Sequence, residues 1–411
     1  MKVVHINHSD WGGGAAIAAH RLHEAMLLTG LDSTMLVVNK NTTDDNVREI
    51  QTSKFRNTMY RCINKVINFT FKFFGTWSLN IYGYDLSNEN AIKNADIIYL
   101  HWINANTLSL KSIEKILSLG KQVYWVMHDM WPITGGCHHS MDCNKFSSNC
   151  TRCPLFFNRR GSSISIDLSY IQFQNKIKHL KKYSNLNIIT PSRWLYNQVK
   201  ISYLFSDKNI YHAPNLINPD IFVHKSKKEA REKLNLPIDK TLLLFGADNF
   251  YSPYKGWNLL KEALKNISNR SDKIKIECVI YGMCEKNVEN EIGLKCHILG
   301  TIKDTDKLVS IYNSCDLFII PSIAENYPNV ILEANACGLP VLGTAVGGIP
   351  EMIKENVNGM LIKKLTVDSF TSQLSSVLSK LNDFNPEIIR SIVIENNSYD
   401  KVMKIHNFVV Q

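Results

Sequence analysis

Short apolar stretches alternate with helical patterns along almost the whole chain of 411 residues. In the first half, strand-like stretches at Val3–Asn7, Ala95–Trp102 and Gln122–Asp129 are separated by such patterns. The strands are nearly continuous in apolar residues, which is typical of parallel strands covered by helices on both faces. The alternation therefore predicts an α/β fold with doubly wound parallel sheets.

The alternation pauses once, near the middle of the chain. The stretch Ser206–His224 contains two prolines and several asparagines, which is typical of a linker. We therefore predict a first Rossmann-like domain at residues 1–205, a linker at 206–224 and a second Rossmann-like domain at 225–397. Ligands of doubly wound sheets bind at the carboxyl ends of the strands, so a cleft between the domains is the expected binding place.

The charge of the chain indicates an anionic partner. Lysines and arginines exceed aspartates and glutamates by ten, which suits nucleic acid, a membrane surface or a phosphorylated small molecule. The chain opens with a stretch that resembles a buried strand rather than a signal peptide. We find no apolar run near the ~18–20 residues of a membrane span. A cytoplasmic location is therefore expected.

Two carboxylates stand out in the apolar segment Pro321–Val341, namely Glu325 and Glu333. Pro328 suits the first turn of a helix, and Gly338 suits its end. This pattern places Glu325 in a loop after a strand and Glu333 about one turn into the helix. The helix start between them favours an anion. An anion with hydroxyls on both sides describes a nucleotide sugar; the alternative is that both glutamates are solvated surface charges.

The segment 321–353, PSIAENYPNVILEANACGLPVLGTAVGGIPEMI, resembles the Glu-x7-Glu signature of retaining glycosyltransferases of family 4. The resemblance continues at 297–320 and at 245–264, and the first half resembles members that build bacterial capsule and exopolysaccharide. It implies the GT-B fold, which is two Rossmann-like doubly wound parallel-sheet domains that face a central cleft. It also implies that a last helix, at 398–411, packs back on the first domain.

The resemblance assigns roles to individual residues. Glu325 would hold hydroxyls of the donor sugar, Glu333 would hold the ribose, and Lys255 would neutralise the departing diphosphate. An arginine usual in the family after the glycine of the preceding strand is missing here. Either Lys255 carries more of this task, or another base such as Arg193 or Lys200 helps. No metal or other cofactor is required for catalysis in the family. The other expected donor-binding residues are Asn326, Tyr327, Pro328, Asn329 and Gly246.

Two further groups of residues follow strands of the first half. Gly12, Gly13 and Gly14 permit a tight turn before a helix and fail the dinucleotide fingerprint at its third position. The resemblance makes this turn an acceptor and phosphate loop; a plain strand-to-helix turn is the alternative. At the ends of two other strands, polar side chains are placed where ligands bind. They are His128, which is a candidate catalytic residue, and His101 and Asp129 beside it.

A cysteine cluster indicates a metal. Cys137, Cys143, Cys150 and Cys153 lie within seventeen positions, and the last two have the spacing of zinc knuckles. We predict a structural zinc without a catalytic role, because the loop between them is polar and has little core of its own. Free thiols or a redox pair are the alternatives.

The segment Lys54–Trp77 alternates basic and apolar residues at roughly helical spacing. Such a helix suits either peripheral contact with an anionic membrane, here the cytoplasmic face of an inner membrane, or a core-facing position with a solvated basic face. The membrane alternative agrees with a lipid-linked acceptor.

The sequence as a whole predicts a retaining hexosyltransferase. It would move a sugar from a nucleotide-diphosphate sugar to a saccharide or polyprenyl-linked acceptor in bacterial surface polysaccharide biosynthesis. One alternative is another GT-B nucleotide-sugar enzyme, such as an epimerase. The other is a basic zinc-knuckle protein that binds nucleic acid; dispersed basic residues and the lack of a nucleic-acid motif speak against it, so no nucleic-acid partner is expected.

Overall fold

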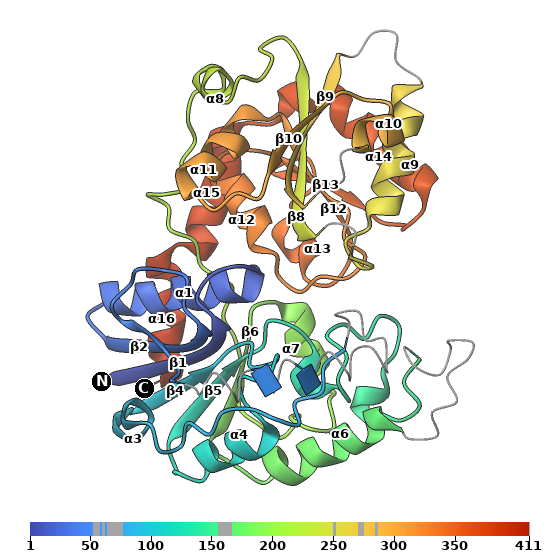
Figure 1. Ribbon diagram of the computed structural model, residues 1–411. Helices are drawn as coiled ribbons and strands as arrows, with labels where there is room; N and C mark the ends of the chain where they lie inside the picture. Colours follow the sequence, from blue (N-terminus) through green and yellow to red (C-terminus); the bar gives the residue numbers. More distant parts are fainter. Residues whose placement is uncertain are drawn as a thin grey trace. The chain divides into compact units, whose positions relative to one another are not determined.

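The computed structural model describes residues 1–51, 58–59, 62–63, 77–154, 167–249, 252–269, 275–283 and 287–410. The chain divides into two compact units. The first contains Met1–Ala213 and Ile405–Gln411, and the second contains Pro214–Lys404. Each unit is built around a parallel sheet (Figure 1). The α/β architecture with two parallel sheets that the alternation predicts is therefore confirmed.

The described residues of the first unit form a seven-stranded sheet in the order β3-β2-β1-β4-β5-β6-β7. All neighbouring strands pair in parallel; His5 of β1, for example, lies opposite Met35 of β2 and Tyr99 of β4. The strands are β1 (Lys2–Ser9), β2 (Asp32–Asn39), β3 (Val47–Glu49), β4 (Ile97–Leu100), β5 (Gln122–Val126), β6 (Leu186–Thr190) and β7 (Ile210–His212).

The helices of the first unit connect these strands. A single π-helical turn at Ile177–Lys181 extends the helix α6. The connecting helices are α1 (Gly14–Leu28), α3 (Asn90–Asn94), α4 (Leu110–Leu117), α6 (Leu168–Lys176) and α7 (Arg193–Lys200), with 3-10 turns at Trp131–Ile133 and Lys145–Ser147.

The described residues of the second unit form a six-stranded parallel sheet in the order β10-β9-β8-β11-β12-β13. The strands are β8 (Thr241–Asn249), β9 (Ile276–Met283), β10 (Cys296–Gly300), β11 (Leu317–Ile320), β12 (Val341–Thr344) and β13 (Gly359–Ile362). The helices are α8 (Lys227–Lys233), α9 (Trp257–Ser268), α10 (Val288–Ile292), α11 (Thr305–Ser314), α12 (Asn329–Ala336), α13 (Ile349–Met352), α14 (Val367–Ser379) and α15 (Pro386–Asn397), with a 3-10 turn at Leu381–Asp383.

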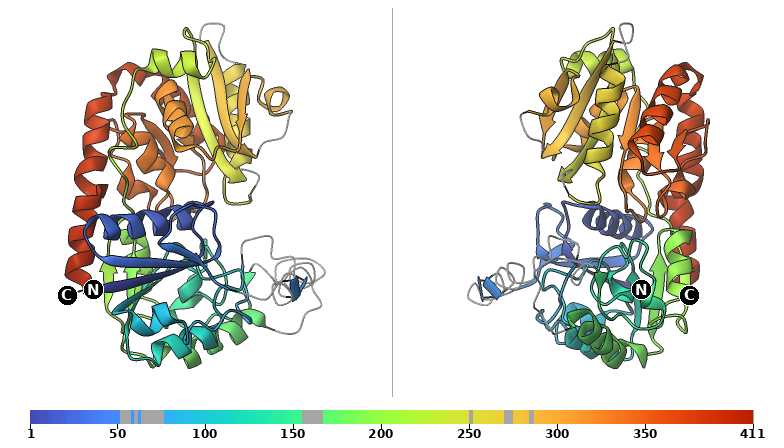
Figure 2. Two further views of the ribbon diagram at one scale, coloured as in Figure 1. Left: turned by 60° about the vertical axis from the view of Figure 1, so that its left-hand side comes forward. Right: turned by 90° about the vertical axis from the view of Figure 1, so that its right-hand side faces the viewer.

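Two apolar clusters cover the two faces of the second sheet, and successive residues of β8 alternate between them. Leu242 and Leu244 pack in the cluster that contains α11 and α12, whereas Leu243 and Phe245 pack in the cluster that contains α9 and α14. This alternation follows from the period of two in a strand. Figure 2 shows helices on both faces of this sheet. An almost continuous apolar strand is the sequence signature of such burial.

The two units meet along the chain at Ala213 and Pro214. Strand β7 lies inside the segment that composition marks as a linker; with three residues at a sheet edge, it is too short to show a strand period. The last helix, α16 (Tyr399–Val410), begins in the second unit, and its residues from Ile405 onward belong to the first. There His406 Nδ1 lies 3.2 Å from the hydroxyl of Tyr99.

Candidate functional site

The loop that carries Glu325 follows β11 and is fixed by its neighbours. Gly347 adopts a positive φ of 54°, and a Cβ atom there would lie 1.6 Å from the carbonyl oxygen of Glu325. Only glycine fits at this position. The hydroxyl of Thr344 donates to the carbonyl oxygen of Ser322, and the hydroxyl of Ser322 donates to Oε1 of Glu325 over 3.2 Å. The loop that follows β12 thus holds the Glu325 loop in one conformation.

Lys255 forms an ion pair with Glu325 across 70 positions of sequence. Gly256, which adopts a φ of 70°, makes this possible, because a Cβ atom there would lie 1.8 Å from the carbonyl oxygen of Pro321. The backbone N–H of Ile323 donates to the carbonyl of Tyr254 over 2.8 Å, so the two loops are joined directly. The side chains of Lys255 and Glu325 keep 31% and 15% of their surface exposed, so a ligand can reach both.

Glu333 lies on α12 and is only 2% exposed. Its Oε2 accepts a hydrogen bond from the hydroxyl of Tyr312 over 2.9 Å, and that hydroxyl lies 3.2 Å from the hydroxyl of Tyr281. Burial raises the pKa of Tyr312 well above its ordinary value, so the phenol stays a donor. The alternative of a solvated surface charge is therefore wrong for Glu333.

Gly246, in β8, lies against the ring of Tyr281. A Cβ atom at Gly246 would lie 2.7 Å from the ring of Tyr281, so the glycine makes room for the tyrosine that contacts Tyr312. Neither tyrosine carries a sequence signal, since both lie in segments with an ordinary strand or helix pattern.

The segment between the two glutamates is tied to the start and end of the second unit. Helix α12 begins at Asn329, and Pro328 is its N-cap. The sequence predicts Pro328 inside the first turn, so the helix begins one residue later than predicted. The amide of Asn215 donates to the carbonyl of Tyr327 and to Oδ1 of Asn329, over 3.0 and 2.9 Å.

The buried side chains of this segment are engaged as well. The amide of Asn397 donates to the hydroxyl of Tyr327 over 3.1 Å, and Asn326 is 3% exposed. Neither Asn215 nor Asn397 carries a sequence signal, because their partners lie more than 60 residues away. Among the predicted donor-binding residues 326–329, Tyr327 and Asn329 are therefore held by hydrogen bonds from Asn215 and Asn397.

In the first unit, the glycine turn leads from β1 into α1. Gly12 and Gly13 have φ values of 83° and 82°, which other residues rarely adopt, and Gly13 is the N-cap of the helix. The carboxylate of Asp10 holds the entry to the turn, because it accepts the backbone N–H groups of Asn41 and Thr42 over 2.7 and 2.9 Å. Gly14 is the first residue of α1.

His101 and His128 follow the neighbouring strands β4 and β5, and the structure brings them together. His101 Nδ1 lies 3.2 Å from His128 Nε2. His101 is 2% exposed, whereas His128 is half-buried. Burial lowers the pKa of His128 to about 4, against the charge of Asp129, which acts in the opposite direction. Both imidazoles are therefore neutral near pH 7, and of the two it is His128 that retains access to a ligand.

Asp129 is engaged by its own neighbours. Its Oδ2 accepts from Trp102 Nε1 over 3.1 Å and lies 2.7 Å from His138 Nδ1, and its Oδ1 accepts the backbone N–H of Trp131 over 2.8 Å. His138 Nε2 in turn lies 2.8 Å from the hydroxyl of Ser78. Asp129 thus orders the start of the cysteine-containing loop.

The four clustered cysteines are all free thiols in the structure. Cys137 and Cys150 are buried, and Cys143 and Cys153 are partly exposed. Burial raises the pKa of Cys150 to about 11, and Cys143 and Cys153 add to this increase. Phe146, at 2% exposure, gives the loop an apolar anchor of its own. Within the described part of the chain, no three His, Cys, Asp or Glu side chains are gathered as metal ligands, so the zinc stays a prediction.

Metal analysis of protein purified without chelators tests that prediction. We expect one zinc per chain, lost in Cys150→Ser and retained in the control Cys62→Ser, whose thiol is exposed and outside the cluster. Zinc uptake should release protons, because burial raises the pKa of the Cys150 thiol, which is therefore protonated in the metal-free fold. An absence of zinc in the unsubstituted protein would contradict the prediction.

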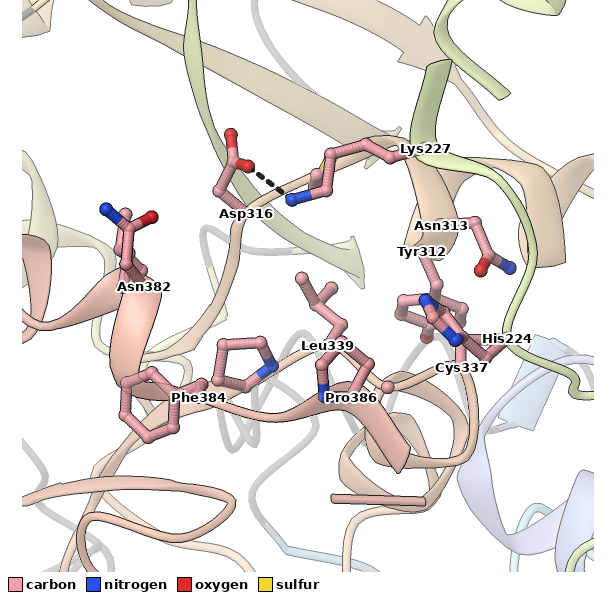
Figure 3. Close-up of a pocket in the computed structure, with 14 residues that line it drawn as sticks. His224, Lys227, Tyr312, Asn313, Asp316, Cys337, Leu339, Asn382, Phe384 and Pro386 are labelled. Atoms are coloured by element: carbon pink, nitrogen blue, oxygen red, sulfur yellow. Dashed lines mark hydrogen bonds and ion pairs between the residues drawn. The ribbon is translucent and has the colours of Figure 1, made fainter. Parts of the chain in front are cut away.

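A pocket of the second unit lies at the opposite edge of the sheet from Glu325. Asp316 and Pro340, which line it, immediately precede β11 and β12, whereas the Glu325 loop follows the end of β11. Figure 3 shows Lys227 paired with Asp316 at this pocket, over 2.6 Å. Because ligands of doubly wound sheets bind at the carboxyl ends of strands, we place the functional site at the glutamate loop.

The segment predicted to contact a membrane, Lys54–Trp77, lies largely outside the described residues. Among the residues that the structure does describe, no helix has the length and apolar character needed to cross a bilayer.

Residues 239–380 match the model of a family described as glycosyl transferases group 1. An uncharacterized glycosyltransferase of Methanocaldococcus jannaschii is 29% identical over 240 residues, which are 56% of this chain and 60% of that protein. The lipopolysaccharide 1,2-N-acetylglucosaminetransferase of Salmonella typhimurium is 28% identical over 205 residues, which are 46% of this chain and 53% of that protein. The chain thus spans little more than half of these relatives.

Solved structures resemble the chain over its whole length. The sucrose-phosphate synthase from Thermosynechococcus elongatus has a TM-score of 0.66 at 15% identity and covers 99% of this chain, which covers 98% of that one. Anabaena HepE in complex with UDP-glucose has a TM-score of 0.64 at 14% identity, with coverages of 100% and 99%. Residues 239–380 of this chain therefore resemble the group 1 glycosyltransferases, and the chain as a whole has the two-domain GT-B fold.

Proposed function

We propose that the protein is a retaining glycosyltransferase that moves a hexose-type sugar from a nucleotide-diphosphate sugar to a saccharide or polyprenyl-linked acceptor. The observation that carries this proposal is the pairing of Lys255 with Glu325, beside a helix that bears the buried Glu333. The arrangement supplies a cation for a diphosphate and two carboxylates that accept hydrogen bonds from hydroxyls.

The ion pair suggests how the donor is received. Without ligand, the ammonium of Lys255 neutralises Glu325. A diphosphate offers Lys255 a stronger anion, and Glu325 then accepts hydroxyls of the sugar in place of the ammonium. Glu333, already oriented by Tyr312, accepts the ribose hydroxyls.

The reaction that we propose needs no enzyme nucleophile and no metal in catalysis. The bond between the anomeric carbon and the diphosphate oxygen breaks while the acceptor oxygen attacks from the same face. The proton of the acceptor passes to the departing phosphate oxygen, whose growing charge Lys255 stabilises.

Two comparisons support the chemical class of the substrates. The structure of HepE was solved with UDP-glucose, and the Salmonella relative is named for transfer to lipopolysaccharide. We therefore propose a role in bacterial surface polysaccharide biosynthesis. A polyprenyl-linked acceptor would bring the enzyme to a membrane surface, which co-sedimentation with anionic vesicles would test.

Thermal denaturation with a panel of nucleotides and nucleotide sugars tests donor binding. We expect at least one nucleoside diphosphate to raise the Tm, because a ligand that binds only the folded state stabilises it. The increase should largely disappear in Glu333→Gln and persist in Glu351→Gln, a control carboxylate on α13. If no nucleotide or nucleotide sugar raises the Tm, the proposal fails. If the bound nucleotide sugar is converted without any acceptor, the epimerase alternative is correct.

A further inference from the structure

Two cysteines of the second unit face each other across neighbouring strands. Cys278 lies in β9 and Cys296 lies in β10, and the two are direct partners in the parallel register of these strands (Figure 1). Both side chains belong to the apolar cluster that contains α9 and α14, so they lie on the same face of the sheet. The two thiols also interact as hydrogen-bonding partners. The fold thus brings together two thiols that are well separated in the sequence.

The spacing of the two strands suits a disulfide. Neighbouring strands lie about 4.7–4.9 Å apart, and the Cα atoms of disulfide-bonded cysteines are usually about 4.4–6.8 Å apart. Cys278 and Cys296, as register partners on one face, meet this requirement. Both are free thiols in the structure, so rotation of the two side chains is the main movement that the bond requires.

The surroundings give the two thiols different access to solvent. Cys278 is fully buried, whereas Cys296 is partly exposed on β10, the edge strand of the sheet that the described residues form. The hydrogen bond with Cys296 and burial hold the pKa of Cys278 well above its ordinary value, so its thiol stays protonated near pH 7. An oxidant in solution therefore reaches Cys296 first, and Cys278 is the second thiol directly beside it.

We propose that Cys278 and Cys296 form a redox modification site, for which the oxidant is a small-molecule disulfide such as oxidised glutathione. The Cys296 thiolate attacks one sulfur of the oxidant, so that a mixed disulfide forms and the first thiolate of the oxidant leaves. The sulfur of Cys278 then attacks that of Cys296, gives up its proton and displaces the second thiol. The two cysteines are thereby oxidised to one disulfide, and the disulfide of the oxidant is reduced to two thiols.

The bond joins the edge strand β10 covalently to β9. Because it closes a loop between positions 278 and 296, it restricts the unfolded chain and so stabilises the folded second unit. In a reducing compartment the pair remains a dithiol. The bridge therefore forms only when the disulfide fraction of the surrounding thiol pool rises, and it is independent of the proposed transfer reaction.

Peptide mapping under non-reducing conditions tests the bond. Folded protein that is incubated with oxidised glutathione and then alkylated should yield the tryptic peptides 276–286 and 296–303 as one cross-linked species. Because peptide 276–286 contains a second cysteine, Cys284, the same mapping is done on Cys284→Ser. The cross-link should persist in Cys284→Ser and disappear in Cys296→Ser. Its absence from the unsubstituted protein, or its loss in Cys284→Ser, would overturn the proposal.

Thermal denaturation of the oxidised and reduced forms tests the effect on stability. We expect oxidation to raise the Tm of Cys284→Ser by about 5 °C more than that of Cys296→Ser, since only the first of these variants keeps both thiols of the pair. Other cysteines are the same in both variants, so their oxidation does not contribute to the difference. An equal change in the two variants, or a lower Tm for oxidised Cys284→Ser, would show that the bond does not stabilise the second unit. Neither measurement uses a nucleotide sugar, so the result stands whether or not the proposed function is correct.

Discussion

Replacing Lys255 with alanine should lower turnover by about 10²- to 10³-fold, the usual effect of removing one group that stabilises transition-state charge. The structure supplies a second reason, since the substitution leaves the Glu325 carboxylate, 15% exposed, without its cation. That carboxylate would then face the diphosphate as an uncompensated negative charge. Steady-state kinetics with a donor identified by thermal denaturation would measure the effect.

The ion pair makes the two single substitutions interdependent. Glu325→Gln should also lower turnover, whereas the double variant Lys255→Ala with Glu325→Gln should lose less than the product of the single losses. Lys261→Ala is a suitable control, because Lys261 lies on α9, the helix that follows Lys255, and is paired there with Glu291 of α10. Equal turnover in Lys255→Ala and Lys261→Ala would contradict the proposal that Lys255 stabilises the departing diphosphate.

Acidification from pH 6.5 to pH 5 should destabilise the first unit. Burial lowers the pKa of His23 and His406 to about 4 and that of His5 and His101 well below the ordinary value. These side chains stay neutral in the folded protein and gain a proton on unfolding below about pH 6.5. Their contribution is complete above pH 6.5 and falls as the pH is lowered towards 4, by up to about 2 kcal/mol per histidine at pH 5.

Denaturant titrations at a series of pH values would measure this effect. The free energy of unfolding should decrease between pH 6.5 and pH 5, above the range in which most carboxylates titrate. His406→Gln should show a shallower decrease than the unsubstituted protein, by about the contribution of one histidine. The substitution His224→Gln serves as the control, because His224 is on the surface of the second unit and pairs with Glu387. A stability that is flat or rises on acidification would contradict this prediction.

The sequence predicts the fold well because burial of parallel strands leaves a local pattern. The stretch around Leu243 is apolar at every position, since both faces of β8 are covered. The end of α12 can also be predicted from the sequence, because Gly338 adopts the positive φ of 76° that ends a helix. The short strand β7 escapes prediction because three residues at an edge need no apolar period.

The candidate site is predictable only where a residue type is unusual for its position. Glu333 stands out as a carboxylate within an apolar helix, and the structure gives it a buried partner in Tyr312. Tyr312, Asn215 and His5 do not stand out, because a tyrosine in a helix, an asparagine in a loop and a histidine in a strand each have ordinary explanations. Their roles arise from neighbours that only the folded chain brings close.

The division of the chain has a consequence for its synthesis. The first unit is assembled from two ends of the sequence, since Ile405–Gln411 belong to it and His406 approaches Tyr99 in its core. These residues leave the ribosome only after the whole of the second unit has been made. Domains generally fold as units during synthesis. Of the two units, the one that begins earlier in the chain is therefore completed only after the other has been made. A chain that ends before Ile405 would lack the residues that complete the first unit.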